Sequence, residues 1–125
     1  MNLRAKALVA SCVLTLIVGF SSSTSAHSFP EEEIPSAGST VHAPPNRVTI
    51  KYDAPIEKLF ASIEVLNAAG HSEVAGQPQL SSDGLTLSIP VNKLDSGEYT
   101  VKWRVVCVDT HHTEGSYSFT VAGNS

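Results

Sequence analysis

From residue 47 onward, the chain alternates apolar and polar positions over short stretches. Residues 47–52 show this clearly, with Val48, Ile50 and Tyr52 on one side and polar side chains on the other. A period of two residues is typical of a β-strand with one buried face. The alternation recurs at Ile63 and Val65, at Leu85, Leu87 and Ile89, at Tyr99, Val101, Trp103 and Val105, and at Tyr117, Phe119 and Val121. The pattern therefore predicts a succession of short strands.

Residues that favour turns separate these stretches. They are Ala54-Pro55, Ala69-Gly70, Gly76-Gln77-Pro78, Ser82-Asp83-Gly84, Asp95-Ser96-Gly97 and Glu114-Gly115. No helical period is sustained, so we expect an all-β fold, an antiparallel Greek-key β-sandwich or barrel of Ig-like type. Residues 27–45 hold four of the seven prolines and alternate little, which predicts an irregular arm that crosses the sandwich.

Composition limits the size and the partners of this fold. The chain has 125 residues, 42% of them hydrophobic and 16% charged, which suits one domain and leaves no room for a second. Its formal net charge of -4 argues against nucleic acid as a partner, because a phosphate-binding surface needs clustered Lys and Arg.

The first 26 residues have the three parts of a secretory signal. Arg4 and Lys6 form a positive start, residues 7–20 are apolar, and small residues lead to Ala26. The apolar run falls short of the ~20 residues of a membrane span, and no positive cluster follows it. We therefore predict a signal peptide over residues 1–26, cleaved after Ala26, and an exported domain over residues 27–125 with no stable membrane insertion. Lipid attachment at Cys12 is a less favoured alternative, because most of the apolar run follows that residue.

Cleavage changes the charge and the cysteine content. It removes two of the eight basic residues and none of the twelve acidic ones, which brings the net charge near -6. Cys107 is then the only cysteine, so no intramolecular disulfide can form. Its strand parity matches that of Trp103 and Val105, and we expect its side chain in the core as a small hydrophobic group. A Cys with two His also forms blue-copper sites, but the spacing here disfavours that role.

Metal-binding side chains gather at two places, the predicted mature N-terminus and residues 109–112. A terminal His27 could bind one metal ion through its free amine and its ring Nδ1, because the amine, with an ordinary pKa near ~7.7, loses its proton readily. In an extended chain Asp109 and His111 point to one side and His112 points away. Nitrogen donors with a carboxylate suit Cu(II) better than Ca²⁺ or Mg²⁺, and zinc remains possible on ligand type.

The two remaining histidines carry weaker signals. His42 lies in the proline-rich arm, where it could approach the metal site, although an ordinary loop imidazole is the better interpretation. His71 follows Gly70 at a predicted turn, and we expect no metal role for it.

Several strings add a family resemblance to this reading. They are Ile34-Pro35-Ser36-Ala37-Gly38, Ala43-Pro44-Pro45, residues 48–55, Leu94-Asp95-Ser96-Gly97-Glu98-Tyr99, W-R-V-V-x-x-D-x-H at residues 103–111, and G-x-Y-x-F-x-V at residues 115–121. Together with His27, they resemble the CopC-type periplasmic copper-binding proteins over residues 27–125. The resemblance implies a periplasmic Greek-key β-sandwich that holds one Cu(II) through the amine and imidazole of His27, with Asp109 and His111.

The chain departs from that family at three positions. Its only methionine is Met1, within the predicted signal, so we expect no Met-rich Cu(I) site. Ala54 stands where many members carry Glu, and Asp53 or one of the glutamates at residues 31–33 could supply that carboxylate. Cys107 stands where the family usually has a small polar residue.

We therefore predict a copper carrier or buffer in copper resistance and homeostasis, and no enzymatic activity. The resemblance alone implies a CopD-type inner-membrane protein as the partner that receives the copper. One alternative is a copper-dependent polysaccharide oxidase built on the terminal His27, for which so short a chain offers little substrate surface. Another is an Ig-like adhesion module with incidental histidines, although no row of exposed aromatic residues suggests a carbohydrate face.

Overall fold

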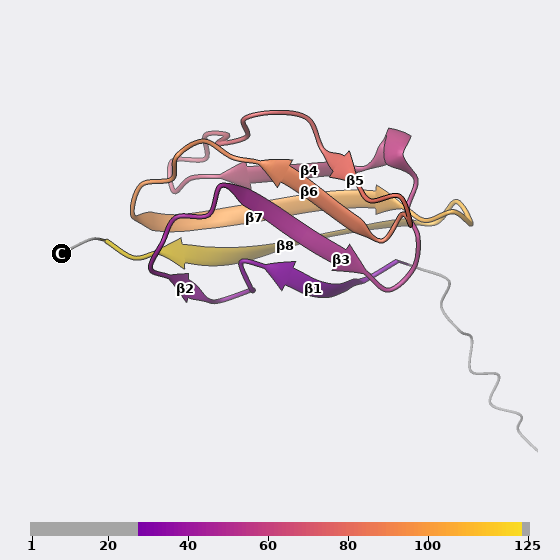
Figure 1. Cartoon of the computed structure of the whole chain (residues 1–125), viewed down its shortest axis with the longest axis horizontal. Helices are drawn as coiled ribbons and strands as arrows, with labels where there is room; N and C mark the ends of the chain where they lie inside the picture. Colours follow the sequence, from indigo (N-terminus) through magenta and orange to yellow (C-terminus); the bar gives the residue numbers. More distant parts are fainter. Residues whose placement is uncertain (1–27, 124–125) are drawn as a thin grey trace, which may run out of the picture.

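The computed structural model of the protein describes residues 28–123, which form two β-sheets packed face to face (Figure 1). Neighbouring strands follow the order β1-β3-β6-β5 in the first sheet and β2-β8-β7-β4 in the second. The elements are β1 (Pro30–Ile34), β2 (Thr40–Val41), β3 (Arg47–Tyr52), the 3₁₀ turn η1 (Lys58–Phe60), β4 (Ser62–Leu66), β5 (Gln79–Leu80), β6 (Thr86–Pro90), β7 (Gly97–Val106) and β8 (His112–Val121). All paired strands are antiparallel except β2 and β8, so the predicted fold class is confirmed.

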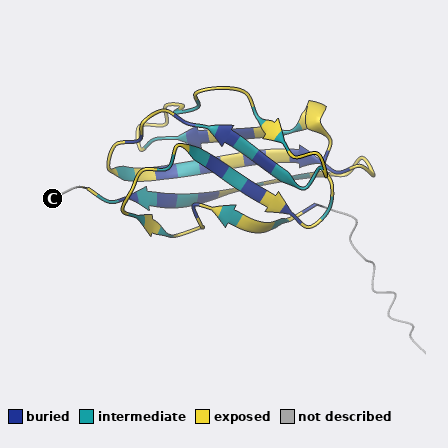
Figure 2. Ribbon diagram, in the orientation of Figure 1, coloured by how far each residue is buried: buried dark blue, intermediate teal, exposed yellow. Residues whose placement is uncertain are grey.

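The core lies between the sheets and is built from the apolar positions of the alternating pattern. On β3, for example, Val48, Ile50 and Tyr52 are fully buried while the residues between them are not (Figure 2). The Tyr52 ring meets Trp103 of β7 edge to face at 5.5 Å between centroids. Burying one face of each strand is the main favourable contribution to folding, at ~25 cal/mol per Å² of apolar surface.

The β7–β8 hairpin is the longest pairing, and it fixes the two ends of the sandwich. Its register runs from Gly97 opposite Val121 to Val106 opposite His112. We call the end that holds the connecting residues 107–111 the hairpin end, and the other the far end. β3 also ends, and β4 begins, at the hairpin end, whereas β2 pairs with residues 120–121 at the far end. Ten strand residues separate the two ends by ~30 Å.

The predicted turn at Glu114-Gly115 is wrong, because both residues lie inside β8. Gly115 is paired with Trp103, and a Cβ atom at this position would lie 2.7 Å from Cζ2 of the indole. A glycine within a strand often marks such a close approach rather than a turn. The glycine at position 115 is therefore explained by the packing of Trp103 and not by a turn.

The prediction for residues 27–45 is partly wrong. The segment does cross from one sheet to the other, but it contains two paired strands: β1, whose register with β3 shifts between Pro30 and Glu32, and the two-residue β2. Pro30 is the first residue of β1, at the edge of its sheet, where proline is tolerated, and the glutamates that follow protect an open edge from pairing with other chains. The predicted signal peptide and His27 lie outside the described residues. Within residues 28–123, no helix has the length and apolar character to cross a membrane.

Candidate metal centre

The chain reverses direction at the hairpin end within residues 107–111. The Cys107 N–H donates to the His111 carbonyl at 3.0 Å, and the Thr110 N–H donates to the Cys107 carbonyl at 2.8 Å. Thr110 has φ of 76°, in the left-handed region that allows so tight a reversal. Asp109 and His111 therefore do not lie in extended chain as predicted, because a turn rather than strand parity sets the directions of their side chains.

The turn nevertheless brings Asp109 and His111 together. Asp109 Oδ2 lies 3.1 Å from His111 Nδ1, and Asp109 Oδ1 accepts the His111 N–H at 3.2 Å. Hydrogen bonds, first from the Cys107 thiol and then from the His111 ring, lower the pKa of the Asp109 carboxyl from 3.8 to about 2. The carboxylate is therefore ionised at neutral pH, next to an imidazole on the surface that a metal ion can reach.

Cys107 is the third donor in this place, although its contact with Asp109 was not predicted. The residue is buried, at 1% exposure, as predicted. Its Sγ, however, lies 2.6 Å from Asp109 Oδ1 and 3.3 Å from the His111 carbonyl oxygen. One ligand atom from each of Cys107, Asp109 and His111 lies within 4.8 Å of the others. The sequence held one signal for this cluster: its three donors are spaced two residues apart, so a turn in this segment can bring them together.

The described part of the chain begins at the same end. Ser28 is fully buried, its hydroxyl donates to the Pro55 carbonyl at 3.3 Å, and its own carbonyl accepts from Thr113 Oγ1 at 2.8 Å. Pro55 follows β3 of the first sheet and Thr113 belongs to β8 of the second. The Phe29 N–H adds a bond to Asp53 Oδ1 at 2.8 Å. The arm is thus fixed between the two sheets at the hairpin end.

The acidic side chains considered for the position of Ala54 have other surroundings. Asp53 holds the arm through the Phe29 N–H. Glu31 pairs with Lys51 Nζ at 3.7 Å, and burial raises the pKa of the Glu33 carboxyl. None of them belongs to the cluster of Cys107, Asp109 and His111, and no second cluster of three His, Cys, Asp or Glu donors occurs within residues 28–123.

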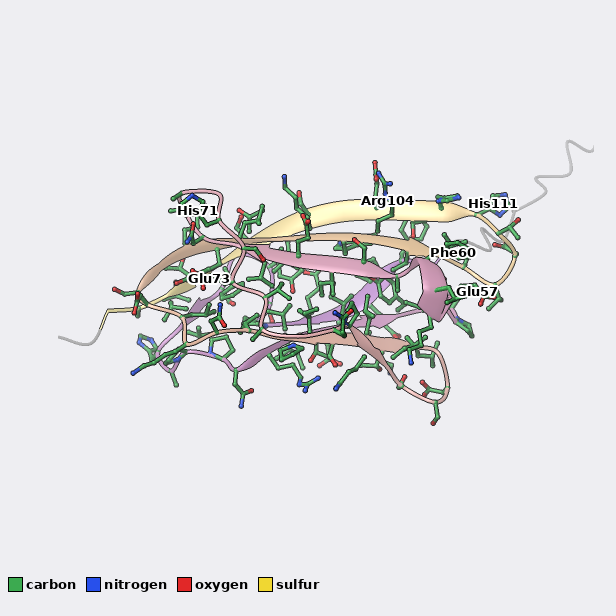
Figure 3. The ribbon with its side chains drawn as sticks, turned by 90° about the horizontal axis from the view of Figure 1, so that it is seen from above. Glu57, Phe60, His71, Glu73, Arg104 and His111 are labelled. Carbon is green, nitrogen blue, oxygen red and sulfur yellow. The ribbon has the colours of Figure 1, made fainter. Side chains whose placement is uncertain are left out.

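The other described histidines lie outside the cluster. His112 is exposed at the first position of β8. His42 follows β2, and His71 lies beyond the end of β4, so both are at the far end. In Figure 3, His71 and His111 are seen at opposite ends of the molecule.

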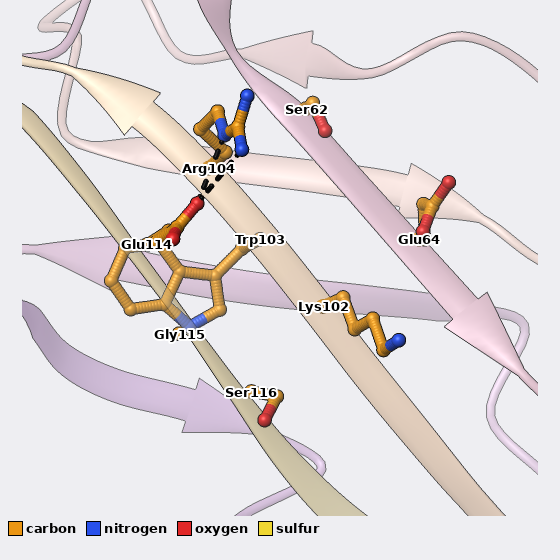
Figure 4. Close-up of a pocket in the computed structure, with 8 residues that line it drawn as sticks. All are labelled: Ser62, Glu64, Lys102, Trp103, Arg104, Glu114, Gly115 and Ser116. Carbon is orange, nitrogen blue, oxygen red and sulfur yellow. Dashed lines mark hydrogen bonds and ion pairs between the residues drawn. The ribbon is translucent and has the colours of Figure 1, made fainter.

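A separate hollow lies on the outer face of the second sheet (Figure 4). The exposed side chains of Arg104 and Glu114 cross it, joined by an ion pair of 3.0 Å. Its lining contains neither His nor Cys, so it does not compete with the hairpin end as a metal site.

Comparison with known proteins decides the family. A family model described as the CopC domain matches residues 31–122. The chain belongs to the CopC family. The match contains Asp109 and His111 and begins after His27.

The chain is similar to three named proteins with CopC or copper resistance in their names. Copper resistance protein C of Escherichia coli is 30% identical over 114 residues, which cover 85% of this chain and 90% of the relative. The crystal structure of CopC from Methylosinus trichosporium OB3b is 32% identical with a TM-score of 0.74, and the match covers 79% of this chain and 97% of that one. PcoC, a methionine-rich copper resistance protein from E. coli, is 26% identical with a TM-score of 0.67 and coverages of 77% and 99%. These relatives confirm the CopC resemblance and connect the chain with copper resistance.

Proposed function

We propose that this protein is an exported carrier or buffer of Cu(II) that binds one ion per chain. The ligands are the amine and imidazole of His27, the carboxylate of Asp109 and the imidazole of His111. The observation that carries the proposal is the contact of 3.1 Å between Asp109 and His111 at the end where the arm is anchored. The naming of a relative as a copper resistance protein supports copper as the metal.

The anchoring of Ser28 supports His27 as the first ligand. Consecutive Cα atoms are ~3.8 Å apart, so a residue joined to Ser28 starts from the hairpin end, whatever its own conformation. The terminal chelate also needs cleavage directly before His27, which we propose from the signal in residues 1–26. Export through that signal delivers the protein to the periplasm.

The chemistry of the described donors supports Cu(II). The ionised carboxylate of Asp109 offers a negative oxygen, and His111 offers an imidazole nitrogen, which together suit a tetragonal Cu(II) site. Both side chains are exposed, so the ion can enter and leave without opening the core. Such accessibility fits a carrier that hands its copper onward.

We further propose that the acceptor is a CopD-type inner-membrane protein that docks at the hairpin end. Apolar side chains are exposed there: Leu59 at 90%, Phe60 at 61% and Val108 at 59%. The N–H of Glu57, which precedes η1, donates to the Val106 carbonyl at 2.8 Å, and this bond holds η1 beside the hairpin, as Figure 3 also shows for Phe60 and His111. Exposed apolar residues beside a metal site favour docking of a partner that receives the metal.

We expect no oxygenase activity from the copper form. An oxygen-activating copper site keeps a coordination position open. Asp109 as a direct ligand would occupy such a position and would add negative charge to the site. Hydrogen peroxide or oxidised sugar, produced by the copper-loaded protein with a reductant, would overturn this expectation.

The deciding experiment is a Cu(II) titration of the protein that begins at His27, beside a control with one extra residue before it. The control keeps every side chain and removes only the terminal chelate. Electron paramagnetic resonance and the fluorescence of Trp103, the only tryptophan, report binding. We expect one tetragonal, nitrogen-rich Cu(II) in the native form and much weaker binding in the control. Equal binding by the two proteins would remove His27 from the site.

A further inference from the structure

Cys107 is the donor of the cluster with Asp109 and His111 that the proposed Cu(II) site does not use. It is one of the buried core residues, although it lies outside the main cluster of packed apolar side chains. Its Sγ instead contacts Asp109 Oδ1 at 2.6 Å and the His111 carbonyl oxygen at 3.3 Å. The thiol is therefore directed toward the two proposed copper ligands.

The spacing of these three side chains is close to that of a metal site. One ligand atom from each lies within 4.8 Å of the others. Two donors at ~2.0–2.3 Å from a shared ion are at most ~4.6 Å apart, so only a small inward movement is needed. The exposed Asp109 and His111 can make that movement, whereas Cys107 is held beneath them by its backbone bridge to Ile56.

Sulfur brings a preference that the other donors lack. Soft thiolate and thioether ligands select Cu(I), whereas imidazole and carboxylate suit Cu(II). The only methionine is Met1, so the thioether route to Cu(I) is closed once the signal is removed. Cys107 is the sole sulfur atom after residue 12.

We infer that Cys107 gives this site a second metal form: Cu(I) held by the Cys107 thiolate and the His111 imidazole. The inference rests on the proposed function, because His111 serves both oxidation states. The copper arrives as Cu(I), the S–H bond breaks, a Cu–S bond forms, and the proton leaves to solvent. Neither copper nor sulfur changes oxidation state. The protein thus retains copper whichever state its donor supplies.

Burial of Cys107 fits this role in an oxidising compartment. At 1% exposure its sulfur cannot reach the same cysteine of a second chain, so the thiol is protected from forming an intermolecular disulfide. A small ion that enters between the exposed Asp109 and His111 reaches it from the turn.

The test compares the protein isolated after export with its Cys107→Ser variant. Cu(I) is supplied without oxygen and competed against a chromophoric Cu(I) chelator, and Cu(II) affinity is measured separately. We expect the variant to bind Cu(I) about 100-fold more weakly or worse, since it loses the soft donor. Its Cu(II) affinity should change little, because the serine hydroxyl can still donate to Asp109. Equal weakening for both ions would make Cys107 a positioning residue and overturn the inference.

X-ray absorption of the wild-type Cu(I) form gives a result that does not depend on any variant folding. A copper–sulfur distance in the mature protein can come only from Cys107, and a first shell without sulfur would overturn the inference. If wild-type protein binds Cu(II) while the Ser variant keeps full Cu(I) affinity, this inference alone fails. If wild-type protein binds no copper in either state, the proposed function fails with it.

Discussion

The two ends of the sandwich carry similar residues and differ in chemistry. At the far end, the turn before His71 is closed by Asn67, whose Oδ1 accepts the N–H groups of Ala69 and His71 at 3.0 Å. At the hairpin end, Asp109 Oδ1 likewise accepts a backbone N–H of its own turn, that of His111, and the carboxylate also faces a thiol and an imidazole. The turn at Asn67 carries a neutral amide and has only a structural role. The turn at Asp109 carries a carboxylate and is the candidate metal site. A histidine in a turn is therefore informative only together with the side chain that closes the turn.

The strongest test of this comparison removes the histidines at the two ends one at a time. His111→Ala should weaken Cu(II) binding by about 100-fold or more, because even outer-sphere changes at metal sites cost about 10–100-fold. His42→Ala and His71→Ala, at the far end, should leave the affinity unchanged. Competition titrations with a Cu(II) chelator measure all three. A loss of Cu(II) affinity in either far-end variant would contradict a copper site at the hairpin end.

A second test uses two glycines at or near β8. Gly115→Ala places a Cβ 2.7 Å from the Trp103 ring and should destabilise the fold by about 1–3 kcal/mol. Gly123→Ala, at the far end, brings its Cβ no closer than 3.6 Å to Ser96 and should be neutral or slightly stabilising. Urea unfolding measures both free energies. Equal stabilities of the two variants would contradict the packing explanation for Gly115.

A third test uses two buried tyrosines. The Tyr99 hydroxyl, at the far end, donates to the Asp95 carbonyl at 2.7 Å, so Tyr99→Phe should cost about 1 kcal/mol. The Tyr52 hydroxyl, at the hairpin end, has no hydrogen-bond partner among the described residues, and burial raises its pKa far above the ordinary value. Tyr52→Phe should therefore be neutral or stabilising in the same unfolding experiment. A clear loss of stability in Tyr52→Phe would show that its hydroxyl is bonded in solution.

The smallest expected effect is the titration of Asp109 in the copper-free protein. Its pKa is lowered to about 2, so its contribution to stability is complete above its unfolded pKa of 3.8 and is lost as the pH falls through about 2. Cys107→Ala should raise this pKa, because it removes the largest cause, whereas Cys107→Ser retains a donor. Carboxyl NMR titrations follow the midpoint. An unchanged midpoint in Cys107→Ala would show that the thiol does not lower the pKa of the Asp109 carboxyl.

The sequence predicted most of the fold because strand alternation is local. Each apolar side chain of residues 47–52 is buried as the period of two requires, and β3 has the predicted bounds. The wrong predictions concern residues whose structural role depends on contacts with residues distant in the sequence. Gly115 indicates a turn locally, but it is needed for the packing of Trp103. The prolines and the weak alternation of the arm indicate irregular chain until the strands that pair with β1 and β2 are known.

For the candidate site, the sequence by itself supplied the candidate donors and the metal class that such donors suit, since imidazole and carboxylate groups are properties of residue type. The amine of His27 stays a prediction, because it depends on cleavage after Ala26. The family could also be predicted, from the strings around residues 103–111. Only the tertiary structure decided which donors meet. The backbone reversal at Thr110 turns Cys107 toward Asp109 and His111, and bonds from two sheets fix Ser28 beside them. Those contacts depend on chain segments up to 85 residues apart, which no local pattern records.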